Sequence, residues 1–248
     1  MKLLIINPNI SQSVTDLIEA EARRVAAADT LIEMATARSG VAYIETRFEA
    51  LLGAHAAATL AGERVGHYDA VLIAAFGDPG LPALKEALEV PVVGMTEASL
   101  MTAAQLGQRI SIIAISRRIT AWYRECVDQC GLLGRLATIR HLDAALRDPG
   151  SVQADHAARL LELSRLAVEQ DGADVLILAG APLAGLARTL AGQLPVPVVD
   201  GVSSGVCQAQ VLVRLNAGKA LQGSFARPPK KPHAGLADGL AALLQRDA

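Results

Sequence analysis

The chain has 248 residues, of which 52% are hydrophobic and 19% are charged, so it is long enough to bury the core of one or two domains. With 23 Lys and Arg against 25 Asp and Glu the formal charge is −2, which gives no electrostatic reason to expect a nucleic acid partner. The three Cys argue against a secreted disulfide framework, and no apolar stretch reaches the ~18 residues of a membrane span, so we expect a cytoplasmic protein without a membrane partner.

Short apolar runs along the chain predict buried strands, because each is rich in Val and Ile, lasts about four to eight residues and ends at a turn former. In chain order these runs are Leu3–Ile6, Ala70–Ala74, Val90–Val93, Ile110–Ile115, Val175–Leu178 and Val196–Val199. Stretches with helical spacing of apolar residues alternate with them, at 13–27, 47–61, 120–130, 152–170, 205–215 and 235–244. This alternation predicts an α/β fold in which helices cover parallel sheets.

An internal repeat predicts how these elements are organised. The segment that begins at Val71 resembles the segment that begins at Val175, at an offset of 104 residues. The later segment Val90–Val93 resembles Val196–Val199 at an offset of 106. A repeat that contains strand, loop, helix and strand predicts two similar α/β halves that face each other across a cleft.

The repeat also divides the chain. We assign residues 1–100 to the first half and residues 101–215 to the second, with the crossover near residues 95–105. Residues 216–248 are expected to return and pack on the first half.

Polar loops follow several of the predicted strands, where strand ends and helix N-termini offer free backbone N–H groups to a ligand. The first loop carries Asn7, Asn9 and Ser11, whose amide and hydroxyl groups suit a ring carbonyl or ring N–H, although Ser11 is equally typical of a helix N-cap. Arg47 and the pair Arg117 and Arg118 are the available cations for a substrate carboxylate, of which only one would be needed. The other candidate contacts to a small-molecule substrate are Phe76, Gly77, Thr96, Ser116, Gly180 and Pro182. No Cys and His pair has the spacing of zinc ligands, so we expect no metal.

The sequence resembles the Asp/Glu/hydantoin racemase superfamily, and most closely its hydantoin and allantoin racemase branch. The resemblance is carried, in the same order over about residues 1–215, by Asn-Pro-Asn at 7–9, Phe-Gly-Asp-Pro-Gly-Leu at 76–81, Pro-Val-Val-Gly at 91–94 with Glu97 and Ala98, and Pro-Val-Val-Asp-Gly at 197–201. It implies two pseudo-symmetric Rossmann-like halves with a small-molecule site between them. It also implies that the protein uses no metal and no organic cofactor and forms a homo-oligomer.

The family's mechanism, as the resemblance implies it, uses two cysteines on opposite faces of the substrate to exchange a proton next to a carbonyl group. The matching positions here are Ala75 and Ala181, and alanine has no titratable group. Cys126 and Cys130 lie four residues apart on a predicted helix and are expected to fill the core. Cys207, near a predicted helix start that would lower its pKa, remains a candidate.

Without these thiols, the leading interpretation is an enzyme that acts on a small cyclic ureide, of the hydantoin or thiohydantoin type, by hydrolytic or lyase chemistry. Glu97 or Asp78 would activate a water, and backbone N–H groups of the Gly77 and Gly180 loops would hold the oxyanion. Each carboxylate also has a structural interpretation, as a helix-start acid for Glu97 and as a turn residue for Asp78. Two alternatives stay open: a racemase whose two catalytic cysteines are absent, and a noncatalytic small-molecule binder.

Overall fold

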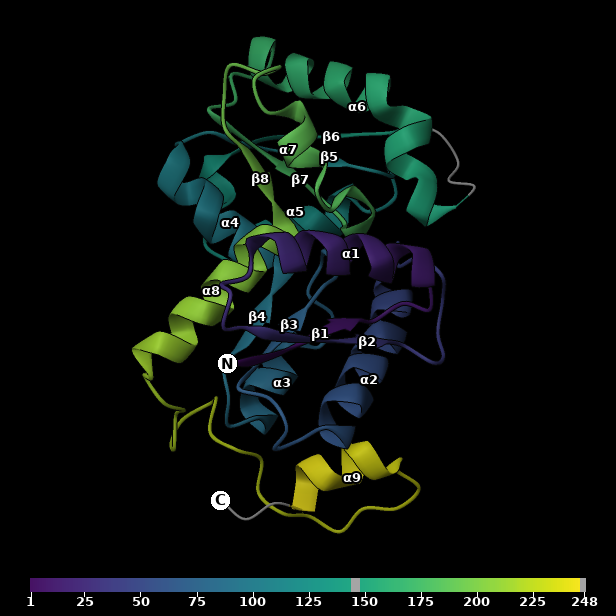
Figure 1. Cartoon of the computed structure of the whole chain (residues 1–248), viewed down its shortest axis with the longest axis vertical. Coiled ribbons are helices and arrows are strands. Elements are labelled where there is room, and N and C mark those ends of the chain that lie inside the picture. The colour runs from purple at the N-terminus through teal and green to yellow at the C-terminus, as the bar shows by residue number, and fades with distance from the viewer. Residues whose placement is uncertain (144–147, 246–248) are drawn as a thin grey trace.

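The computed structural model describes residues 1–143 and 148–245. In these ranges the strands form two parallel four-stranded sheets, with the orders β2-β1-β3-β4 and β6-β5-β7-β8 (Figure 1). The first sheet contains β1 (Lys2–Asn7), β2 (Leu31–Thr36), β3 (Ala70–Ile73) and β4 (Val92–Gly94). The second contains β5 (Ile110–Ala114), β6 (Leu136–His141), β7 (Val175–Leu178) and β8 (Val198–Asp200). The predicted α/β class with parallel sheets is confirmed.

Six of these strands coincide with the apolar runs of the sequence, and β2 and β6 do not. Both are edge strands: in β2 exposed and partly buried residues alternate up to the buried Ala35, and β6 is partly buried throughout. An edge strand covered on one side needs no continuous apolar run, so the run pattern misses it. The strands β4 and β8 each begin just after a proline, Pro91 and Pro197, because proline has no N–H to donate to a sheet.

Helices cover both sheets, and they include three that the apolar spacing does not reveal, namely α3, α4 and α7. The helices of the described ranges are α1 (Gln12–Val25), α2 (Arg47–Glu63), α3 (Leu81–Ala87), α4 (Met95–Leu106), α5 (Thr120–Gln129), α6 (Val152–Glu169), α7 (Leu186–Leu190), α8 (Gly201–Leu215) and α9 (Asp238–Gln245). The helices α3 and α7 have seven and five residues, too few for a periodic pattern to emerge.

Two helices cross between the halves and join their cores. Helix α4 follows β4 of the first sheet but also packs on β7 and β8 of the second, and α8 follows β8 but packs on β3 and β4 of the first. At the second crossing, a methyl group on Gly205 of α8 would overlap the side chain of Leu72 in β3. Buried residues of both sheets and both crossing helices therefore form one continuous apolar cluster.

The C-terminal helix α9 packs on α2, at the lower end of the molecule in Figure 1. The close contact between the two helices depends on two glycines. A methyl group at Gly62 would overlap the backbone of Gly239, and a methyl group at Gly239 would overlap the carbonyl oxygen of Thr59. Helix α9 thus lies against α2.

Candidate active site

Two loops occupy equivalent places after the central strands β3 and β7. We call residues 74–80 the first site loop and residues 179–185 the second site loop. The N–H of Ala74 donates to the carbonyl oxygen of Ile6 at 2.8 Å, and the N–H of Ala179 donates to that of Ile113 at 2.9 Å. These bonds continue the β1–β3 and β5–β7 ladders by one residue, so the loops leave their sheets in the same register.

The residues that follow make equivalent backbone hydrogen bonds in the two loops. Ala75 accepts the N–H of Asp78 at 3.1 Å, and Gly180 accepts the N–H of Leu183 at 2.9 Å. The loops end at Gly80 and Gly185, both left-handed, with φ values of 82° and 83°. The structure therefore relates Ala75 to Gly180 at an offset of 105, one residue before Ala181, the position that the family resemblance gave for the second cysteine.

The first site loop is covered by α5 from the second half of the chain. The Phe76 ring packs against Tyr123 with 4.6 Å between ring centroids. A methyl group at Gly77 would overlap the indole of Trp122, so this position needs glycine for a close approach as well as for its φ of 103°. Nothing in the sequence indicates the contact with Trp122, because it joins segments about 45 residues apart that no local pattern links.

The second site loop contacts helices from both halves. Its short 3₁₀ turn, Ala181–Leu183, is buried and contacts α1 of the first half. Gln153 on α6 donates to the carbonyl oxygens of Pro182 and Ala184 at 3.0 and 2.8 Å. A methyl group added at Gly180 would make only ordinary contacts, the nearest at 3.6 Å, so it would overlap no neighbouring atom. Gln153 had no signal in the sequence, since polar residues are common in a first helical turn.

The loop after β1 is a hydrogen-bonded polar network. The Asn7 side-chain nitrogen lies 3.0–3.1 Å from three acceptors, Asn9 Oδ1, the carbonyl oxygen of Ser11 and Thr15 Oγ1, for its two N–H groups, so it has no donor left for a ligand. Ser11 is the N-cap of α1 and accepts the N–H of Val14. Asn9 accepts at Oδ1 from Asn7 and from the Ser11 N–H, whereas its Nδ2 donates to no atom of the described residues. Asn9 is therefore the member of this loop with free donors.

Asp78 lies at the end of the first site loop, with its carboxylate at the N-terminus of α4. Its oxygens accept the backbone N–H groups of Thr96 and Glu97, both at 2.8 Å, and Thr96 Oγ1 accepts the N–H of Gly77 at 2.6 Å. Burial raises the pKa of Asp78 to about 7, against the lowering effect of these backbone hydrogen bonds. Its backbone φ of 46° is left-handed, as is frequent for Asp and Asn in turns.

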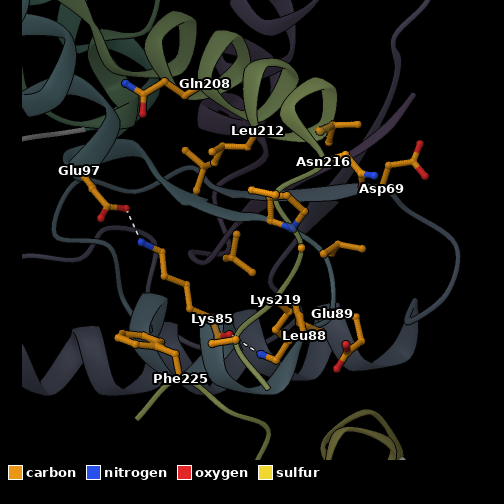
Figure 2. Close-up of a pocket in the computed structure, with 18 of the residues that line it drawn as sticks. Asp69, Lys85, Leu88, Glu89, Glu97, Gln208, Leu212, Asn216, Lys219 and Phe225 are labelled. Carbon is orange, nitrogen blue, oxygen red and sulfur yellow. Dashed lines mark hydrogen bonds and ion pairs between the residues drawn. The ribbon is translucent and has the colours of Figure 1, made fainter. Parts of the chain in front are cut away.

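Glu97 is paired with Lys85, which lies outside both site loops. Figure 2 shows its carboxylate directed at the ammonium group of Lys85, which lies 2.6 Å away. The pair lines a pocket of about 660 Å³ between α3, β4, α8 and the segment around Phe225. Glu97 is thus engaged in an ion pair at the wall of a pocket that no residue of the two site loops lines.

The predicted cation and Ser116 also have protein partners. Arg47 Nε donates to Glu125 Oε2 at 3.0 Å, an exposed pair that links α2 to α5 across the two halves. Ser116 accepts the N–H of Arg118 within its own turn. Tyr43 packs against the core of the second half, and its buried hydroxyl has no hydrogen-bond partner among the described residues. An unpaired buried hydroxyl is costly, so this group is a candidate donor to a ligand.

The three thiols lie outside the site loops and are protonated near neutral pH. Burial raises the pKa of Cys126 to about 12 and that of Cys130 to about 11, and it also raises the pKa of the exposed Cys207. The described ranges contain no group of three His, Cys, Asp or Glu side chains that could hold a metal ion. None of the helices within them is long and apolar enough to cross a bilayer.

The model of the Asp/Glu/hydantoin racemase family matches residues 3–209 of the chain. The chain belongs to this family. It is 35% identical to the hydantoin racemase of Paenarthrobacter aurescens over 237 residues, which cover 94% of this chain and 100% of the relative. The structure is similar to that of the allantoin racemase from Klebsiella pneumoniae, with a TM-score of 0.92 and 32% identity over 97% of this chain and 98% of the other. For the allantoin racemase from Pseudomonas fluorescens the TM-score is 0.88 and the identity 33%, over 95% and 100%.

These similarities put the chain in the hydantoin and allantoin racemase branch, and they make it a hydantoin/allantoin racemase-like enzyme. The resemblance read from the loops at 76–81 and 197–201 is confirmed at this level. In the racemase-like fold, the two site loops are the equivalent segments of the two halves.

Proposed function

We propose that the chain is a racemase of the hydantoin or allantoin type that binds a five-membered cyclic ureide between its two site loops and lacks the thiols that would exchange the ring proton. The observation that carries the proposal is the pair of loops in equal register, with Ala75 in one and Gly180 in the other. The full-length similarity to hydantoin and allantoin racemases supports the choice of ligand.

Neutral hydrogen-bond donors suit the recognition of such a ring. The free Nδ2 of Asn9 and the unpaired hydroxyl of Tyr43 would donate to ring carbonyl oxygens, which are uncharged acceptors. Arg47 is already paired with Glu125, so an ion pair between Arg47 and a substrate carboxylate would contribute less binding energy. The proposal therefore favours an uncharged ureide over an amino acid.

Racemisation at the ring carbon needs one group that removes the proton and a second, on the opposite face, that returns one. Ala75, Gly180 and Ala181 have no group that could do either. The hydrolytic chemistry expected from the sequence gains no support, because both oxygens of Asp78 accept backbone N–H groups and Glu97 is paired with Lys85. We therefore expect the chain to bind the ureide and to exchange its proton slowly.

The test restores the thiols at the two equivalent positions. We would prepare A75C/G180C, with A75C/A181C as the matched variant shifted by one residue and A75C as the single control. Each protein is incubated in D₂O with an enantiopure 5-substituted hydantoin and with allantoin. Deuterium at the ring carbon is followed by proton NMR and inversion by optical rotation.

The double variant with correctly placed thiols is expected to incorporate deuterium and invert the substrate, while A75C alone does neither at a comparable rate. Gly180 has φ 110°, where a side chain is strained, so circular dichroism must show that A75C/G180C is folded. Activity in A75C/A181C alone would reassign the second position to residue 181. Folded double variants that neither bind nor racemise either compound would refute the proposal, and ring opening by the unmodified chain would favour a hydrolase.

A further inference from the structure

A carboxylate joins the first site loop to the helix after the next strand. Asp78 Oδ1 accepts the N–H of Thr96, and Asp78 Oδ2 accepts the N–H of Glu97, each at 2.8 Å. In return, Thr96 Oγ1 accepts the N–H of Gly77 at 2.6 Å. Loop and helix α4 therefore hold each other through three hydrogen bonds, which we call the first bridge.

The second site loop is joined to α8 by a different acid. Asp200 is the N-cap residue of α8, and its Oδ1 accepts the N–H of Ser203 at 2.9 Å. Its Oδ2 accepts the N–H of Gly185, the last residue of the second site loop, at 2.7 Å. These two hydrogen bonds form the second bridge.

The two bridges join equivalent segments, a site loop and the helix after the next strand. The acid belongs to the loop in the first bridge and to the start of the helix in the second. Gly94 ends β4 and is the N-cap of α4, just as Asp200 ends β8 and is the N-cap of α8. A methyl group on Gly94 would overlap the carboxyl group of Asp78, so an acid fits on only one side. In the second half the position equivalent to Asp78 is Leu183, which is buried and apolar.

Backbone N–H groups, rather than cations, stabilise both acids. Neither Asp78 nor Asp200 is in an ion pair within the described ranges, although an ion pair lies beside each: Lys85 with Glu97, and Arg24 with Glu21. Three of the four accepted N–H groups, those of Thr96, Glu97 and Ser203, belong to first helical turns and have no partner inside the helix, and the fourth belongs to Gly185, the N-cap residue of α7. A carboxylate at this place satisfies donors that would otherwise be buried unpaired.

The bridges also connect the halves, because α4 packs on the second sheet and α8 packs on the first. We infer that Asp78 and Asp200 are positioning residues, each of which fixes a site loop to the helix that crosses to the opposite half. The bridges would thereby set the places of residues 75 and 180 relative to each other. The link between each site loop and its crossing helix follows from the hydrogen bonds alone. Its role in binding a ureide rests on the proposed function.

Amide hydrogen exchange of the unliganded protein, followed residue by residue by NMR, tests the coupling without any substrate. In Asp78→Ala the amide hydrogens of Thr96 and Glu97 are expected to exchange at least about tenfold faster, relative to that of the buried Ala103 further along α4, because each loses a charge-assisted hydrogen bond. In Asp200→Ala the amide hydrogens of Gly185 and Ser203 should likewise exchange faster. This second variant tests the inference independently if Asp78→Ala does not fold.

A double variant moves the first acid to the position that the second half uses. In D78G/G94D the new carboxylate is expected to accept the N–H groups of Gly80 and Glu97, the equivalents of Gly185 and Ser203. Protection should return at Glu97 and rise at Gly80, while Thr96 stays as fast as in Asp78→Ala. Unchanged exchange at Thr96 and Glu97 in a folded Asp78→Ala would overturn the inference, as would a folded double variant that protects neither Gly80 nor Glu97.

A binding measurement then asks whether the bridges serve the site. The Kd of a 5-substituted hydantoin, by calorimetry in the A75C/G180C background, is expected to rise about tenfold with Asp78→Ala and to recover in the variant with the moved acid. If Asp78→Ala speeds amide exchange at Thr96 and Glu97 but leaves the Kd unchanged, the positioning role is wrong. If no variant binds the hydantoin, the proposed function is wrong. The exchange data still test the bridges, because they are measured without substrate.

Discussion

The two halves of the molecule make the same connection with acids from opposite sides. In the first half, Asp78 reaches from the loop to α4. In the second half, Asp200 reaches from the start of α8 to the loop. A repeated fold thus preserves a hydrogen-bonded link while the residue that makes it changes place. Matching residues by type between the halves therefore misleads, and matching by strand register does not.

The two acids also differ in surroundings. Asp78 is enclosed between the loop, α4 and α5, and burial raises its pKa to about 7. Asp200 lies beside a surface pocket lined by Glu21, Arg24 and Arg188, and burial also raises its pKa. The first bridge should thus be the more sensitive to added volume and to pH.

The largest effect is expected from Gly94→Ala. The added methyl group must displace the Asp78 carboxyl and leave two N–H groups unpaired, so we expect the free energy of unfolding to fall by about 3 kcal/mol. Urea denaturation measures it. Gly134→Ala is the matched control, because a methyl group there meets no atom within 4 Å. In an Asp78→Gly background Gly94→Ala should cost less than about 1 kcal/mol, and an equal cost in both backgrounds would contradict the contact.

Asp200→Ala comes next. It removes the cap of α8 and the acceptor of the Gly185 N–H, and should lower the free energy of unfolding by about 1–2 kcal/mol. Asp200→Asn keeps one acceptor oxygen and should recover part of the loss. Asp148→Ala, at the exposed cap of a short 3₁₀ turn, is the control and should cost less. A loss at Asp200 no larger than at Asp148 would mean that the second bridge is unimportant.

The pH dependence of stability isolates Asp78. Its folded pKa of about 7 lies above the reference value of 3.8, so the folded state binds the extra proton and stability falls as pH rises from about 4 to above 7. Between pH 6 and pH 8 this group should lower the free energy of unfolding by about 1 kcal/mol. Asp78→Asn should remove that part of the slope. Parallel curves for the two proteins would show that Asp78 does not titrate in this range.

The smallest effect is expected at the exposed pair of Arg47 and Glu125, although it joins the two halves. A double-mutant cycle with Arg47→Gln and Glu125→Gln should give a coupling of about 0.5 kcal/mol or less, reduced further by salt. The pair of Arg23 and Glu19 within α1 is the comparison. A coupling above about 1.5 kcal/mol would mean that surface charge helps to hold the halves together.

Among the candidate site residues, the sequence was most informative for those whose role is local. Ser11 is a helix cap and Gly77 lies in a tight loop, as their residue types indicate. For Glu97 and Arg47 the sequence could not supply the partner, because Lys85 and Glu125 meet them only through the packing of separate helices. Asn7 and Asn9 have the same side chain, and only their hydrogen bonds distinguish the saturated one from the one with free donors.

The sequence by itself determined the α/β class, six of the eight strands in the described ranges and the family, because continuous apolar runs and loop motifs are local properties of the chain. Tertiary structure alone decided three things: that α4 and α8 exchange halves, that Ala75 corresponds to Gly180, and that Asp78 and Asp200 make equivalent bridges. Each of these depends on hydrogen bonds and packing between residues distant in the sequence. The spacing of apolar residues along the chain specifies an element and its buried face but not its distant partners, so it could not reveal them.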